Sequence, residues 1–145
     1  MAEIMRAADA TWKGDLKGGA GTINTTSGVR AGTAYSFATR FENKPGTNPE
    51  ELIAAAHAAC YSMAFAHTLA QKGHNPQSIT TQATCHLEPV SGGFRITRVH
   101  LHVRGVVPGL DNDTFKEIAV EADNGCPVSN LLRCGLTLQL DAALE

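Results

Sequence analysis

A chain of 145 residues with 43% hydrophobic residues predicts a single domain, spanning residues 1–145, with a core of useful size. Its net charge is only -2, and its twelve basic residues and six histidines are scattered, which argues against nucleic-acid binding. No stretch approaches the roughly 20 apolar residues of a membrane span, and the first residues lack the apolar core of a signal peptide, so we expect a cytoplasmic protein with no membrane partner. In that reducing compartment, reactive or simply buried thiols are expected rather than structural disulfides at Cys60, Cys85, Cys126 and Cys134.

The first part of the chain, residues 8–41, carries short β-like runs separated by glycine turns. The runs at 12–15, 21–25 and 34–41 predict an antiparallel meander. The last run alternates along its length, so it is expected to form one strand that ends near Arg40.

A long helix is predicted next. Asn48 suits its N-cap, Pro49 its first position, and Glu51 would complete a capping box, while Gly73 marks its end. Because residues 54–60 are almost all small, we expect this helix to be central and buried. Glu50, Ile53, His57 and Cys60 fall on one face, although Glu50 and Cys60 are about 15 Å apart along the axis.

The remaining elements follow in chain order, with a bulge expected near residues 97–98. They are a strand hairpin over residues 79–87 and 94–103, helices over 111–124 and 127–133, and a closing strand over 136–140. The order βββ-α-ββ-αα-β predicts an α+β fold with antiparallel sheets packed on central helices.

Two cysteines lie in settings that make a thiol reactive. Cys126 stands between Gly125 and Pro127 at a helix start, where unpaired backbone N–H groups are expected to point at its sulfur. Cys60 is either a second redox thiol or a small apolar residue of a packed helix. Cys85 and Cys134 are interpreted as structural.

His57 lies one helical turn before Cys60, which leaves two other kinds of site open. The pair could provide two metal ligands, with Cys126 as a third, but no spacing of the CxxC or HxxxH type supports this. It could also be a base and a nucleophile, although neighbours on one helix suit that role poorly. His57 is therefore interpreted as a polar wall residue.

Arg40 and Glu50 flank the same loop. They are either a surface ion pair of little energetic value or, if buried beside Cys60, a device that keeps its sulfur as a thiolate. In the second case Glu50 would fix the guanidinium and its charge would act on the sulfur.

Several motifs resemble the OsmC/Ohr family of thiol peroxidases. Residues 46–60 (GTNPEELIAAAHAAC), followed by 62–64 (SMA), resemble its first signature, and residues 125–132 (GCPVSNLL) resemble the second. The runs 12–15, 35–41 and 107–110 fit as well, so the resemblance covers nearly the whole chain. His57 favours the osmotically inducible protein C branch.

The resemblance implies roles for four residues: Cys60 as the peroxidatic cysteine, Cys126 as the resolving one, Glu50 as the catalytic glutamate and Arg40 as its arginine partner. It also implies an intertwined homodimer with both active sites at the subunit interface. The expected substrates are organic hydroperoxides and hydrogen peroxide, and the expected reductant is a dithiol such as lipoamide or a lipoylated protein. No metal, haem or flavin is expected.

Two other classes of protein stay open at this point. One is a redox sensor or metal-binding protein that uses His57, Cys60 and Cys126 without turnover. The other is a small-molecule binding protein whose pocket would use the apolar residues Phe41, Tyr61, Met63 and Leu131.

Overall fold

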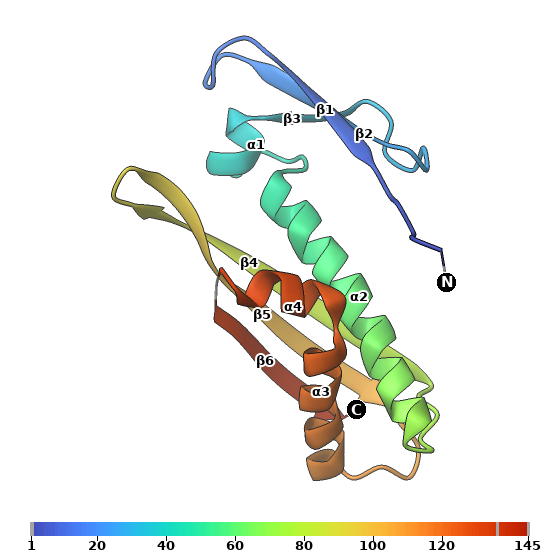
Figure 1. Cartoon of the computed structure of the whole chain (residues 1–145). Helices are drawn as coiled ribbons and strands as arrows, with labels where there is room; N and C mark the ends of the chain where they lie inside the picture. The colour runs from blue at the N-terminus through green and yellow to red at the C-terminus, as the bar shows by residue number, and fades with distance from the viewer. Residues whose placement is uncertain (1, 136, 145) are drawn as a thin grey trace. The chain divides into compact units, whose positions relative to one another are not determined.

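The structure, a computed structural model, describes residues 2–135 and 137–144. It divides into two units, residues 1–49 and 50–145. The first unit contains an antiparallel sheet in the order β1-β2-β3, drawn in blue in Figure 1. Its strands are β1 (Ala8–Lys13), β2 (Ala20–Thr25) and β3 (Thr33–Ser36), which confirms the predicted meander.

The expected strand over residues 34–41 is wrong in its second half. β3 ends at Ser36, and residues Phe37–Phe41 form a short helix, α1, with Arg40 in its last turn. The cause is local: the Ser36 hydroxyl accepts the Thr39 N–H at 3.2 Å, and the Thr39 hydroxyl accepts the Ser36 N–H at 2.9 Å. This capping box turns the backbone into a helix before the strand pattern can continue.

The long helix of the second unit is α2 (Pro49–Gln71), which agrees closely with the prediction. Its end is a Schellman motif, in which the His74 N–H bonds the Leu69 carbonyl and the Gly73 N–H bonds the Ala70 carbonyl. Gly73 has φ +84°, a conformation that glycine adopts without strain. By length and composition α2 could cross a membrane, but its buried side chains contribute to the core of this unit.

The second sheet has the order β4-β5-β6. β4 (Ser78–Val90) and β5 (Gly93–Val106) form the predicted hairpin, and the register shift that leaves Thr97 unpaired confirms the expected bulge. One detail differs from the prediction: β6 (Thr137–Leu144) pairs parallel to β5. The intervening helices, α3 (Asn112–Gly125) and α4 (Pro127–Arg133), carry the chain back along the sheet, which is the crossover that a parallel pair requires.

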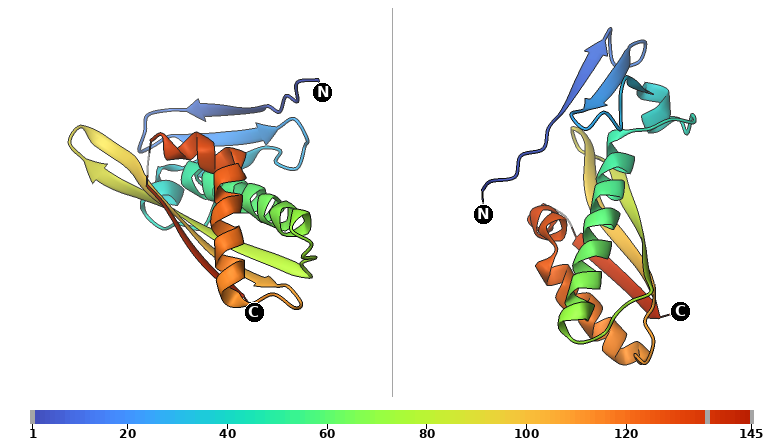
Figure 2. Two further views of the ribbon diagram at one scale, coloured as in Figure 1. Left: turned by 60° about the horizontal axis from the view of Figure 1, so that its bottom comes forward. Right: turned by 90° about the vertical axis from the view of Figure 1, so that its right-hand side faces the viewer.

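Helices α2 and α3 cover one face of this second sheet (Figures 1 and 2). The core between them is formed by aromatic and aliphatic side chains of α2, β5 and α3. It includes Tyr61, Phe65, Leu69, Val99, Leu101, Val103, Phe115, Ile118 and Ala122.

The expectation that α2 is buried holds for one face of the helix. Glu50, His57 and Tyr61 are buried at helical spacing, whereas Ala59 and Met63 face outward, and Met63 is 75% exposed. A single layer of sheet can cover only one side of a helix. The α+β class itself is confirmed.

Candidate active site

The structure brings the two predicted redox cysteines together. Cys60 lies in the middle of α2 and Cys126 lies at the N-cap of α4, and their sulfurs are 3.6 Å apart. Both are free thiols; Cys126 is fully buried, whereas Cys60 is only partly buried. Because a disulfide has an S–S distance of about 2.05 Å, a shift of about 1.5 Å would join them.

The N-terminus of α4 acts on Cys60 rather than on Cys126, which corrects the sequence-based expectation. Cys126 makes no side-chain capping bond. The pKa of Cys60 is raised, first by burial and then by the neighbouring Cys126 thiol, while the backbone N–H of Val128 lowers it. None of these influences is a cation, so these contacts alone do not make Cys60 a thiolate at neutral pH.

Glu50 is a buried carboxylate in the first turn of α2, with 8% of its surface exposed. Its charge reaches Cys85 on β4, where burial first and Glu50 second raise the pKa of that thiol. Cys85 therefore stays protonated at neutral pH, which agrees with its interpretation as structural. Cys134 is exposed at the C-cap of α4.

Arg40 belongs to the first unit, where its guanidinium carbon lies 5.1 Å from the centre of the Phe41 ring. It lines a pocket of about 160 Å³ whose other walls are mainly aromatic and aliphatic. The main contributors are Trp12, Leu16, Tyr35, Phe37 and Phe41. That Arg40 acts together with Glu50 and Cys60 stays a prediction.

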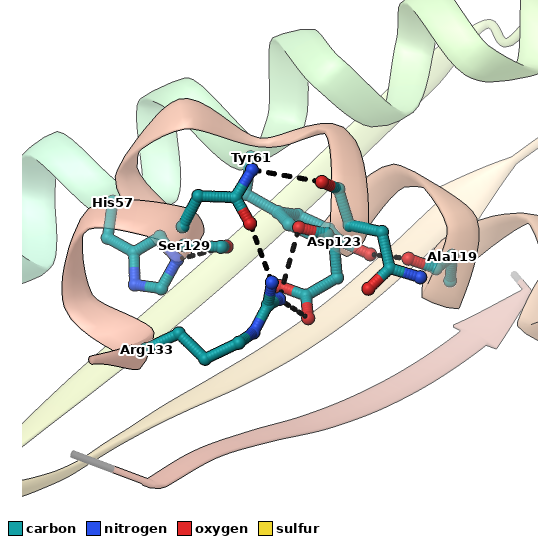
Figure 3. Close-up of polar contacts among 8 residues, drawn as sticks. His57, Tyr61, Ala119, Asp123, Ser129 and Arg133 are labelled. Atoms are coloured by element: carbon teal, nitrogen blue, oxygen red, sulfur yellow. Dashed lines mark hydrogen bonds and ion pairs between the residues drawn. The ribbon is translucent and has the colours of Figure 1, made fainter. Parts of the chain in front are cut away.

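Sequence reasoning missed one contact of this site. A hydrogen bond of 2.8 Å joins Nε2 of His57, one turn before Cys60 on α2, and Oγ of Ser129 on α4 (Figure 3). Both residues are fully buried. Burial lowers the pKa of His57, and the charge of Asp123 acts weakly in the opposite direction. The imidazole is thus neutral at neutral pH. The presence of Ser129 in the second motif was the one available signal.

Asp123 and Tyr61 anchor α3 beside this contact (Figure 3). The Tyr61 hydroxyl donates to the Ala119 carbonyl at 2.8 Å, and burial raises the pKa of this phenol well above its usual range. Asp123 forms an ion pair with Arg133 of α4 at 2.7 Å. Tyr61 is therefore part of the core and does not line a ligand pocket.

The described residues, 2–135 and 137–144, contain no group of three or more His, Cys, Asp and Glu side chains placed to hold a metal ion. Nε2 of His57 is instead directed at a hydroxyl group. Cys60 and Cys126 form a dithiol pair in which Cys60 is partly exposed, and such a pair is suited to thiol–disulfide chemistry.

Comparison with solved structures supports the fold. An organic hydroperoxide resistance protein OsmC from Legionella pneumophila superimposes with a TM-score of 0.77, covering 97% of this chain and 99% of that one at 23% identity.

Comparison with curated proteins and family models gives a closer relationship. The chain is 49% identical over 135 residues to peroxiredoxin OsmC of Escherichia coli K12, which covers 93% of this chain and 94% of that protein. It is 32% identical to organic hydroperoxide resistance protein OhrB of Bacillus subtilis, over 90% of this chain and 96% of that protein. The family model for OsmC-like proteins matches residues 41–141. The chain belongs to the OsmC family.

Proposed function

We propose that this protein reduces hydroperoxides with Cys60 as the peroxidatic cysteine and Cys126 as the resolving cysteine. As a member of its family it is a thiol peroxidase of hydroperoxide defence, that is, a cysteine-based hydroperoxide reductase. The observation that supports the assignment of residues is the 3.6 Å separation of the two sulfurs. A resolving thiol must lie this close, since resolution competes with further oxidation.

The exposure of the two sulfurs supports the order of their roles. Cys60 is partly exposed, so a hydroperoxide can approach its sulfur, whereas Cys126 is fully buried. The exposure of Cys60 also favours reduction of the disulfide. An external dithiol would attack the sulfur of Cys60 and release Cys126 as the leaving thiolate.

The chemistry takes two steps. The Cys60 thiolate attacks the terminal peroxide oxygen; the S–O bond forms, the O–O bond breaks, and the alkoxide takes a proton to leave as an alcohol. Cys126 then attacks the resulting sulfenic acid, forming the disulfide and releasing water. A dithiol reductant, oxidised in exchange, restores both thiols.

Arg40, held in place by Glu50, is proposed to provide the positive charge that keeps Cys60 as a thiolate. Buried carboxylates such as Glu50 are normally compensated by a cation, and an arginine fork matches a carboxylate well. The guanidinium would lower the pKa of Cys60 and polarise the peroxide. The aromatic walls around Arg40 favour peroxides with an organic group over hydrogen peroxide, which remains a second substrate.

Replacing Arg40 tests this role. In Arg40→Ala the pKa of Cys60 should rise, because burial then acts without an opposing cation. The reactive thiolate would form only at higher pH, so the rate of Cys60 oxidation should fall about tenfold or more at neutral pH and recover in alkali. Stopped-flow rates measured across pH give the result.

Arg40→Lys is the matched control. It keeps the positive charge but loses the planar fork, so its profile should lie between those of the wild type and the alanine variant. Identical profiles for all three proteins would contradict an effect of Arg40 on the Cys60 pKa.

A homodimer is proposed to cover the outer face of α2. That face is apolar and small, with Ala55, Ala56 and Ala59 followed by the exposed Met63. An intertwined dimer would place this face against a second copy and form the active site at the interface. Sedimentation should then give twice the 15.3 kDa mass of the chain.

The proposed reductant is a dithiol such as lipoamide or a lipoylated protein. A dithiol releases Cys60 from the mixed disulfide within one molecule, which a monothiol cannot do. Faster turnover with dihydrolipoamide than with glutathione would support this choice. We also propose a cytoplasmic location, where cellular reductants return the oxidised cysteines to thiols.

A further inference from the structure

We propose that His57 and Ser129 form a positioning pair that holds α4 against α2, so that Cys126 reaches oxidised Cys60 before a second peroxide does. The inference rests on the proposed roles of the two cysteines. It concerns the resolution step alone and gives neither His57 nor Ser129 a part in the attack on peroxide.

Two of the contacts between these helices follow a common spacing. His57 precedes Cys60 by three residues on α2, and Ser129 follows Cys126 by three residues on α4. α2 and α4 therefore run antiparallel where they meet. The hydrogen bond of 2.8 Å and the sulfur contact of 3.6 Å lie one helical turn apart along this contact. Loss of the hydrogen bond would therefore change the distance between the two sulfurs.

Burial makes the hydrogen bond an effective link. His57 and Ser129 are both 0% exposed, so water cannot readily replace either partner. Nδ1 of His57 has no hydrogen-bond partner among the described residues, and this leaves Ser129 as the ring's polar anchor. Loss of the Ser129 hydroxyl would leave the whole imidazole unsatisfied in the core.

Helix α4 needs such an anchor because it has only seven residues, and helices of that length are unstable on their own. Side chains of α4 also bond α3: Asn130 donates to the Asn124 carbonyl, and Arg133 donates to Asp123. These bonds fix α4 to α3, while the bond from Ser129 fixes it to the helix that carries Cys60.

The positioning matters because the sulfenic acid on Cys60 has two fates. Either the Cys126 sulfur closes the remaining distance of about 1.5 Å and forms the disulfide, or a second hydroperoxide oxidises Cys60 to the sulfinic acid. If α4 could move away from α2, the first reaction would slow while the second would not. The ratio of disulfide to sulfinic acid therefore reports the position of α4.

The test uses Ser129→Ala, with the ratio of products measured by mass spectrometry after graded additions of cumene hydroperoxide. We expect the disulfide to form at least tenfold more slowly, and the sulfinic fraction at Cys60 to rise correspondingly. The ratio is set after the sulfenic acid has formed, so it does not depend on the rate of the first step.

Three further variants separate positioning from general destabilisation. His57→Gln retains an amide that reaches the position of Nε2 and should restore much of the wild-type ratio, whereas His57→Leu should match Ser129→Ala. Tyr61→Phe removes a different buried hydrogen bond, from α2 to α3, and should leave the ratio unchanged.

The outcomes distinguish this inference from the proposed function. If the wild type forms no Cys60–Cys126 disulfide, the roles of the cysteines are wrong and the pair has nothing to position. If the wild type forms it and Ser129→Ala resolves at the same rate, the positioning role alone is wrong. Equal over-oxidation in Tyr61→Phe and Ser129→Ala would also overturn it.

Discussion

Replacement of Cys60 by serine should abolish peroxidase activity, with turnover falling by at least about a thousandfold. A serine hydroxyl is not ionised near neutral pH and attacks peroxide oxygen far more slowly than a thiolate does. Because Cys60 is only partly buried, the isosteric change should leave the fold intact. Peroxide consumption in the presence of excess dithiol measures the effect.

Cys134→Ser is the matched control for that variant. Cys134 is an exposed thiol at the C-cap of α4, and its replacement should leave turnover near the wild-type rate. Appreciable steady-state activity in Cys60→Ser would contradict the assignment of Cys60, and an equal loss in both variants would point to damage unrelated to the attacking sulfur.

Replacement of Cys126 by serine should give the second large effect, but in a different step. The variant should consume one equivalent of hydroperoxide at close to the wild-type rate and then stop, since its sulfenic acid has no partner 3.6 Å away. With more peroxide, Cys60 should gain a second oxygen atom and become a sulfinic acid. Mass spectrometry of the Cys60 peptide distinguishes the two products.

A failure of Cys126→Ser to consume the first equivalent would show that Cys126 takes part in the initial attack. Sustained turnover with dihydrolipoamide would show instead that an external thiol resolves Cys60 directly. Either result would remove Cys126 from the role of resolving cysteine.

The helices that position the site could be predicted from the sequence because their limits are set by local signals. Pro49 and Gly73 mark the ends of α2, and Gly125-Cys126-Pro127 separates α3 from α4. Each signal acts within a few residues, through fixed dihedral angles or unpaired backbone groups. The candidate cysteines were found for the same reason.

Three other features could not be predicted, because they depend on competing local signals or on contacts between residues far apart in the sequence. At Ser36 a capping box competed with a good strand pattern and turned residues 37–41 into a helix. The parallel pairing of β6 depends on the path taken by two helices. The bond between His57 and Ser129 joins residues 72 positions apart, and its one signal in the sequence is that Ser129 belongs to the second motif.

The thiol at which the N–H groups of α4 point could not be predicted from the sequence either. The sequence predicts that a helix begins at Cys126, and α4 does begin there with a backbone N–H that points at a thiol. Which thiol receives the Val128 N–H depends on how α4 packs on α2, and it is Cys60. Residue type and spacing identified the reactive pair, but packing decided that the Val128 N–H points at Cys60.

The most direct measurement is a titration of free thiols after one equivalent of cumene hydroperoxide, with hydrogen peroxide in parallel. The account predicts a rapid loss of two of the four thiols, restored by a dithiol and absent in Cys60→Ser, with the organic peroxide reacting faster. Retention of all four thiols with both oxidants would contradict the two-cysteine mechanism.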